Sequence, residues 1–204
     1  MANENENLTV RERQAIQTRK NLLDAGKAIF LENGFQKATI SQMIKRAHTG
    51  YGTAYVYFKN KDDLLIVLME EVMEKFYQVA EQSFEPKSKG EAQEQISEQV
   101  RLFLMLAVEE KAMMNVIKEA IGVSQEVEQR WNLIRERFIE RISVDVRYSQ
   151  KKGLANPTFN PVLVARGWFY ANEMFMWDCV KGDNLFSIDD VIMNLTQLYV
   201  DGLY

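Results

Sequence analysis

Apolar residues recur at spacings of three and four along most of the chain, which is the period of an amphipathic α-helix. The first pattern predicts a helix from Val10 to Asn33, with Leu22, Gly26 and Phe30 along one side. A glycine follows directly and supplies the C-terminal stop of this helix. Alternation with period two, the mark of a half-buried strand, forms no comparable pattern.

Two short helices are expected next. Thr39-Ile40-Ser41-Gln42 has the form of a capping box, in which the threonine hydroxyl and the glutamine side chain satisfy free amides at the start of a helix. It predicts a helix of about eight residues, 40–47. After His48-Thr49-Gly50, a third helix fits from Tyr51 to about Tyr57. Asn60 is then a good N-cap for a longer helix.

Six further helices fill the rest of the chain. Gly122 and Gly153 are stop signals, Ser124 and Ser187 are N-caps, and Asn160-Pro161 combines a cap with a proline in the first turn. With 3 prolines and 10 glycines, the chain has few residues suited to the turns of a β fold. The prediction is an all-α protein of about nine helices, the last six spanning 61 to about 83, about 91–108, 111–121, 125 to about 152, 161 to about 181 and 188–204.

Composition narrows the class of protein. Cys179 is the only cysteine and His48 the only histidine, so neither an internal disulfide nor a Cys/His zinc site is expected. The polar first ten residues do not resemble a signal peptide. The most apolar stretch, 161–180, contains three charged residues, too many for a lipid-facing span. We expect a cytoplasmic protein without a metal ion, a cofactor or a membrane partner.

Charge is unevenly distributed. The net charge is −4, but residues 11–61 contain ten basic and three acidic side chains. Residues 62–204 are correspondingly acidic. A positive segment joined to a negative one is the pattern expected when one end of a protein binds a polyanion, although a lopsided solvated surface gives the same count.

Enzyme and phosphate-loop interpretations find little support. A dinucleotide-binding fingerprint beginning at Gly50 requires a third glycine at position 55, which is Tyr55, and no strand precedes it. His48 has no neighbouring nucleophile. Acidic residues on the later helices alternate with Lys and Arg, as on a solvated face, and we expect no catalytic residue among them: Glu109, Glu110, Glu119, Glu126, Glu128, Glu136 and Glu140.

Two short helices joined by three residues and flanked by basic side chains fit a helix-turn-helix. In this motif the second helix enters the major groove of DNA, and small residues let the backbone come close. Gly50 and Gly52 would allow that approach. Thr49, Tyr51 and Thr53 are then candidates for contacts with base edges, while the following tyrosines could contact the DNA backbone or pack under the first helix.

Residues 18–65 closely resemble the DNA-binding domain of the TetR (tetracycline repressor) family. The matching features are Gly34-Phe35, Thr39, Ala47, the run 52–58 (GTAYVYF), and Lys61 with Leu64-Leu65. The resemblance covers about residues 14–75 and implies a helix-turn-helix at about 39–58, followed by an effector-binding and dimerisation domain at 76–204. It implies DNA contacts by Thr39, Lys45, Thr49, Gly50, Tyr51, Gly52, Thr53, Tyr55, Tyr57 and Lys61.

The turn departs from the family pattern. Where the family has a small turn that includes a serine cap, this chain has His48-Thr49-Gly50. Replacing a serine cap by glycine costs only a few tenths of a kcal/mol. The change does remove a hydroxyl that could contact phosphate, which leaves the bases below Tyr51 undefined.

The resemblance also implies regulation. Family members dimerise through their last two helices and read palindromic or near-palindromic operators. Two sets of residues in this chain compete for core and interface: the apolar stripe of residues 188–198 and, on the helix from 161, Leu163, Gly167, Tyr170, Ala171 and Met174. The family also encloses a small, often hydrophobic ligand among helices four to seven, sometimes reached by helix eight. The candidates here are Met73, Phe76, Phe103, Met114, Ile117, Trp131, Phe138, Trp168 and Phe175.

The expected function is that of a bacterial transcriptional repressor, not an enzyme, released from its operator by a small hydrophobic ligand. The alternative is a DNA-binding architectural or protein-recruiting factor without an effector. In that case the aromatic and methionine side chains of the later helices would be ordinary core.

Overall fold

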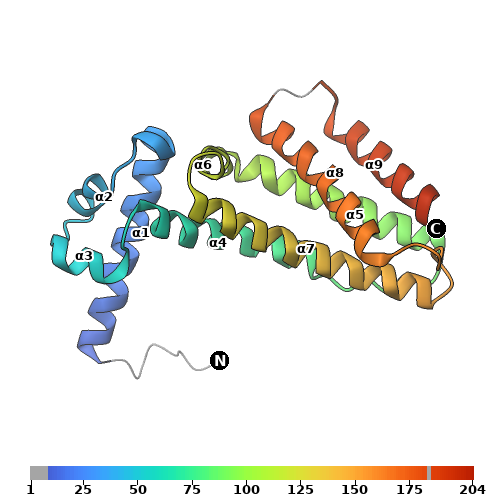
Figure 1. Cartoon of the computed structure of the whole chain (residues 1–204), viewed down its shortest axis with the longest axis horizontal. Helices are drawn as coiled ribbons and strands as arrows, with labels where there is room; N and C mark the ends of the chain where they lie inside the picture. Colours follow the sequence, from blue (N-terminus) through green and yellow to red (C-terminus); the bar gives the residue numbers. More distant parts are fainter. Residues whose placement is uncertain (1–8, 183–184) are drawn as a thin grey trace. The chain divides into compact units, whose positions relative to one another are not determined.

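The computed structural model describes residues 9–182 and 185–204. Within these ranges the chain forms nine helices and no strand, which confirms the all-α prediction (Figure 1). The helices are α1 (Val10–Lys37), α2 (Ile40–Arg46), α3 (Tyr51–Tyr57), α4 (Lys61–Ala80), α5 (Lys89–Glu109), α6 (Lys111–Ile121), α7 (Gln125–Lys151), α8 (Pro161–Lys181) and α9 (Ile188–Leu203).

Local chemistry places most of the helix starts where the sequence predicts them. The capping box before α2 is complete: the Thr39 hydroxyl accepts from the Gln42 amide, and the Gln42 side chain accepts from the Thr39 amide. Asn60 accepts from the Asp63 amide at 2.7 Å. Asn160 and Ser187 likewise cap α8 and α9.

Three helix ends differ from the predictions. α1 runs on to Lys37, although Gly34 is non-helical, with φ 71° and ψ 177°. The predicted stop is therefore a break followed by one further turn. α4 ends at Ala80 and not near residue 83, and α5 begins at Lys89, where the Ser88 side chain accepts from the amide of Glu91.

The chain divides into two compact units. The first contains the described residues through Glu70 and the segment Val116–Glu128, and the second contains Glu71–Asn115 and Gln129–Tyr204. The units do not coincide with the predicted limits 14–75 and 76–204, because the end of α6 and the start of α7 belong with the first unit. Those limits remain a proposal about which residues carry which function.

In the first unit, α1, α2 and α3 pack together (Figure 1). Phe30, Met43 and Leu64 are completely buried. Gly26 permits a close approach of α1 to α4, since a Cβ on Gly26 would lie 2.3 Å from a methyl carbon of Leu64. The helices that carry the basic residues, α1, α2 and α3, therefore pack around a buried apolar core.

In the second unit, α5 packs against both α8 and α9 (Figure 1). Aromatic rings form a continuous chain through its interior: Phe76 meets Phe103 edge to face, Phe103 meets Phe138, and Phe138 stacks on Phe169. None of the helices described is long and apolar enough to cross a membrane. The described side chains also contain no group of three or more His, Cys, Asp or Glu residues able to hold a metal ion.

Candidate nucleic-acid interface and effector cavity

The turn between α2 and α3 is tight because one residue adopts a left-handed conformation. His48 has φ 50°, which side-chain-bearing residues rarely adopt. The amides of His48 and Thr49 then return to the carbonyls of Lys45 and Ile44, both at 3.2 Å. The imidazole is exposed, so His48 serves as a turn residue at the surface and has no catalytic partner among its described contacts.

One face of α3 is buried and the other is open. Ala54 is 2% exposed and points into the core, whereas Tyr51 and Tyr55 are 55% and 46% exposed. Gly52 and Thr53 are exposed beside them. The open face of α3 therefore presents hydroxyls and aromatic rings without any charged side chain.

The two glycines of this region have no internal role that requires glycine. A Cβ on Gly52 would meet no atom within 4 Å, and one on Gly50 would meet only the Thr53 hydroxyl at 4.0 Å. A glycine inside a helix costs about 1 kcal/mol relative to alanine. Open space on the outer face of α3 suits close approach by another molecule.

The predicted DNA-contacting residues surround this face but differ in accessibility. The exposed ones are Thr39, Lys45, Gly50, Tyr51, Gly52, Thr53 and Tyr55, while Thr49, Tyr57 and Lys61 are half-buried. Thr49 also donates to the Ala47 carbonyl at 3.2 Å. Sequence reasoning overlooked Val56, which is 80% exposed on the same helix, although its position one residue after Tyr55 could have indicated it.

Lys61 has internal partners. Its ammonium donates to the carbonyls of Phe35 at 2.7 Å, Ala38 at 3.1 Å and Gln36 at 3.3 Å, and it lies 4.3 Å from the centre of the Phe35 ring. These contacts attach the start of α4 to the end of α1. The predicted role of Lys61 in holding a phosphate stays a prediction, and any test of it must allow for this structural role.

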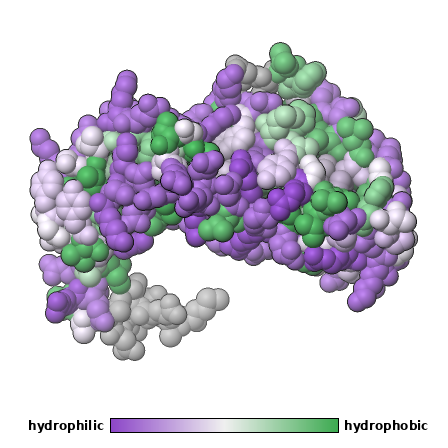
Figure 2. Space-filling model, in the orientation of Figure 1, coloured by the Kyte–Doolittle hydropathy of each residue, from purple (hydrophilic) through white to green (hydrophobic). Residues whose placement is uncertain are grey.

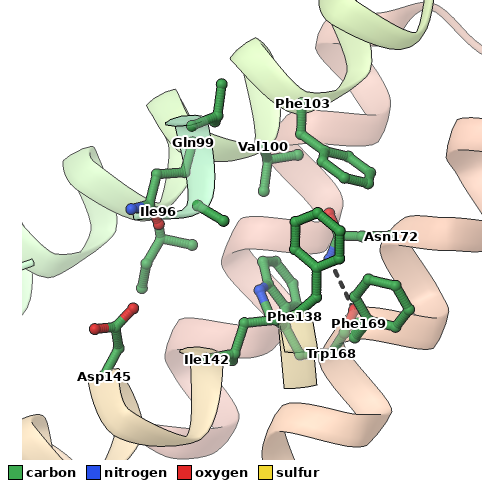
Figure 3. Close-up of a pocket in the computed structure, with 12 residues that line it drawn as sticks. Ile96, Gln99, Val100, Phe103, Phe138, Ile142, Asp145, Trp168, Phe169 and Asn172 are labelled. Atoms are coloured by element: carbon green, nitrogen blue, oxygen red, sulfur yellow. Dashed lines mark hydrogen bonds between the residues drawn. The ribbon is translucent and has the colours of Figure 1, made fainter. Parts of the chain in front are cut away.

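The second unit contains a cavity of about 80 Å³ (Figure 3). Its wall is mainly aromatic and aliphatic, with Gln99 and Asp145 at the end away from the Phe169 ring (Figure 3). The Asn172 side-chain amide donates to the Trp168 carbonyl at 2.8 Å. This donor is therefore already used within the protein and is not offered to a ligand. The lining residues are Val79, Ala80, Ile96, Gln99, Val100, Phe103, Phe138, Ile142, Asp145, Trp168, Phe169 and Asn172.

Asp145 is the only charged residue in this lining. Burial raises the pKa of its carboxyl from the ordinary 3.8 to about 6, although Arg141, which donates to it at 2.7 Å, acts in the opposite direction. A cavity with one acidic end and aromatic walls suits an apolar molecule that carries a hydrogen-bond donor or a positive charge.

A second, smaller cavity of about 10 Å³ lies beside a buried carboxylate. Glu173 is 4% exposed and accepts hydrogen bonds from Trp131 Nε1 at 2.7 Å, Trp177 Nε1 at 3.3 Å and the Arg135 guanidinium at 2.9–3.0 Å. Its charge is thus matched within the protein. Glu173 and Arg135 form an ion pair whose hydrogen bonds are satisfied within the protein. The cavity beside it has room for about one water molecule.

The predicted ligand residues divide between these places. Phe103, Phe138 and Trp168 line the larger cavity, and Met73, Phe76 and Trp131 join the first two around the smaller one. Met114, Ile117 and Phe175 line neither. Sequence reasoning missed Asp145, Gln99 and Asn172, because polar residues on amphipathic helices look solvated until the packing of neighbouring helices is known.

On α8, four of the residues that the sequence leaves undecided between the core and a dimer interface lie at the surface. Leu163, Gly167, Tyr170 and Met174 are exposed, and their spacing of four, three and four places them on one helix face. The apolar stripe of α9 is divided: Leu195 is buried, whereas Leu198 is 75% exposed. Figure 2 shows hydrophobic patches over α8 and α9.

Comparison with known proteins agrees with this geometry. Residues 22–68 match the family of bacterial regulatory proteins described as the tetR family. The chain is 30% identical to the fatty acid metabolism regulator protein of Bacillus subtilis (strain 168) over 184 residues, which is 90% of this chain and 94% of the relative.

Solved structures show the same fold. A TetR-family transcriptional regulator from Syntrophomonas wolfei str. Goettingen has a TM-score of 0.72 at 20% identity, covering 90% of this chain and 93% of its own. The SmeT–triclosan complex has a TM-score of 0.69 at 17% identity and covers 91% of each chain. The sequence match, the fold and the exposed α3 lead to one conclusion: the chain belongs to the TetR family of bacterial regulatory proteins, which are DNA-binding transcriptional regulators and not enzymes.

Proposed function

We propose that this regulator is a repressor that leaves its operator DNA when a small hydrophobic ligand enters the cavity lined by α4, α5, α7 and α8. The observation that carries the DNA-binding half is the open face of α3, where Tyr51, Thr53 and Tyr55 surround a glycine with free space above it. A regulator of this kind acts on the chromosome, so we place it in the cytoplasm.

The ligand half rests on the larger cavity. Its volume of about 80 Å³ is well below the roughly 300–1,000 Å³ of typical ligand pockets. A ligand must therefore displace side chains of the wall, in which Trp168 is half-buried and stacked on Tyr199. Binding that needs such a displacement distinguishes two states of the protein, which is the requirement for a ligand to change DNA affinity.

The relatives support an apolar ligand. One of them regulates fatty acid metabolism, and another is a complex with triclosan, a small aromatic compound. Asp145 adds a constraint, because a carboxylate in the ligand would face a carboxyl group of the protein. We propose an apolar compound whose polar end is neutral or cationic.

We further propose a homodimer formed through the exposed faces of α8 and α9. A seven-residue α3 reads few base pairs, and each wrong base pair costs only about 1–3 kcal/mol, so specific binding requires two copies. The stripe through Leu163, Gly167 and Met174, with Leu198 on α9, supplies an apolar surface for a two-fold interface. A palindromic or near-palindromic operator follows from that symmetry.

Fluorescence anisotropy tests the DNA half. The purified chain is titrated into a labelled duplex taken from the DNA directly upstream of its own gene, with a shuffled duplex of equal length as control. We expect tighter binding to the upstream duplex, because α3 is free to enter a major groove. Equal affinity for both duplexes at low salt would contradict sequence-specific regulation from this site.

Ligand release is tested in the same assay with three compounds of one chain length: octanoic acid, methyl octanoate and octylamine. We expect the ester and the amine to weaken operator binding more than the acid, because only the acid brings a negative charge to Asp145. Release by none of them, with no thermal shift from other apolar compounds, would favour an architectural or protein-recruiting factor without an effector.

A further inference from the structure

Residues 35–38, which form the last turn and the C-cap of α1 directly before α2, are hydrogen-bonded on two sides by side chains of opposite charge. On one side, the Glu119 carboxylate of α6 accepts the amides of Phe35 at 2.8 Å and Gln36 at 3.1 Å. On the other side, the Lys61 ammonium of α4 donates hydrogen bonds to the carbonyls of Phe35, Gln36 and Ala38. We call this arrangement the junction clamp.

The clamp is needed because α1 is interrupted. Gly34, with φ 71° and ψ 177°, breaks the helical ladder, and buried backbone groups near such a break must find partners elsewhere. Glu119 comes so close that a Cβ on Gly34 would lie 2.7 Å from its Oε2. A side chain 84 residues away along the chain therefore supplies acceptors that the local sequence lacks.

The clamped segment sets where the DNA-binding helices begin. Ala38 is the C-cap of α1, and the next residue, Thr39, is the N-cap of α2. Only four residues, 47–50, separate α2 from α3, so the position of α2 also fixes that of α3. An error in the path of residues 34–38 is thus carried into the helix-turn-helix without any flexible linker to absorb it.

We propose that Glu119 is a positioning residue for DNA binding: it touches no DNA, but it holds the junction in the conformation that presents α3 to the major groove. The solvated-face interpretation of the acidic residues is wrong for Glu119, which is half-buried and bonded to the backbone. The proposal assigns it a role beyond the contacts proposed for α2, α3 and Lys61, and rests on DNA binding by this unit.

The sign of the effect separates positioning from simple electrostatics. Glu119→Gln removes a negative charge from the DNA-binding unit, and by charge alone this change strengthens attraction to a polyanion. Loss of a charged acceptor for two backbone amides acts in the other direction. Glu128, on the same unit and exposed, gives a matched control, since Glu128→Gln changes the charge equally.

Binding to the upstream duplex is measured for wild type, Glu119→Gln and Glu128→Gln, with circular dichroism melting to confirm folding. We expect Glu119→Gln to bind about tenfold more weakly than wild type, because charge-assisted hydrogen bonds are lost. Glu128→Gln should bind equally or more tightly. Equal affinities of the two variants would overturn the positioning role.

Amide hydrogen exchange gives a readout that does not depend on DNA. In Glu119→Gln the amides of Phe35 and Gln36 should exchange at least about tenfold faster, while the buried α2 amide of Ile44 stays protected. Unchanged exchange rates at residues 35 and 36 would show that Glu119 does not hold these amides, and would contradict the junction clamp. If wild type bound no DNA while exchange responded as expected, the clamp would stand and the proposed function, with the positioning role, would fall. Glu119→Asp, which keeps the charge on a shorter arm, should recover part of both effects.

Discussion

Two acidic side chains inside the second unit show how partners decide the behaviour of a buried carboxyl. Glu173 is bonded to Arg135 and to two indole nitrogens, so its charge is matched on all sides. Asp145 has Arg141 as its close ionic partner, and burial raises its pKa to about 6. Neither could be identified from the sequence, because a single sequence does not tell which helix covers which residue.

Asp145→Asn tests the cost of that burial. Well below pH 4 the carboxyl is protonated in folded and unfolded chains alike. Between about pH 4 and 6 the folded chain keeps the proton that the unfolded chain has lost, so wild-type stability falls as pH rises through this window. We expect the variant to flatten this part of the profile and to gain on the order of 1 kcal/mol at pH 7 after allowance for solvent screening.

Urea unfolding at fixed protein concentration, at several pH values, measures the effect of Asp145→Asn. The exposed Asp24 provides the control Asp24→Asn, which removes the same charge from a solvated position. A wild-type profile that is flat from pH 4 to 6, or an Asn variant less stable than wild type at pH 7, would argue against a raised pKa.

At the scale of elements, the sequence predicts what neighbouring residues decide. The capping box before α2 and the Asn160-Pro161 start of α8 act over three or four residues, and those helix starts are confirmed. The turn from Gly34 to Lys37 was not predictable. It depends on Glu119 and Lys61, which reach the segment from other helices.

Thr39 shows how one residue can serve an element and a ligand together. Its hydroxyl accepts the Gln42 amide, and it is exposed where a phosphate could be bound. Thr39→Ala should lower stability by about 1 kcal/mol through loss of the cap. If the hydroxyl also holds a phosphate, operator affinity should fall further at every salt concentration.

Gln42→Ala separates these roles, because it removes the other half of the capping box and leaves the hydroxyl in place. Anisotropy and thermal melting of both variants give the comparison. Equal losses of DNA affinity in the two would mean that Thr39 acts only as a helix cap.

On the scale of the whole molecule, the basic surplus of residues 11–61 lies in the first unit, while the acidic surplus of residues 62–204 is shared between the two units, because 62–70 and 116–128 also belong to the first. The family resemblance predicts an all-α fold with an N-terminal helix-turn-helix domain and a C-terminal helical domain, and this fold is confirmed. The sequence could not divide α8 and α9 between core and surface, since apolar residues occur on more than one face of these helices. Packing against α5 decides which side is buried.

Leu198→Glu tests the exposed surface as a dimer interface. Placing a charge there should produce monomers in sedimentation velocity and weaken operator binding by at least about a hundredfold, because the second half-site no longer adds its share. Leu133, 61% exposed on α7, provides the control Leu133→Glu. Dimers that persist in the first variant would place the interface elsewhere.

In a genetic screen for loss of DNA binding, we expect substitutions at Gly34 and at Gly52 to behave differently. Every missense change at a glycine codon introduces a Cβ, and the combination of φ and ψ at position 34 is essentially closed to other residues. Alleles at Gly34 should therefore lose DNA binding whatever the new side chain is. At Gly52, where the structure leaves open space, the outcome should vary with the size and charge of the replacement, because there only the DNA limits what is accepted.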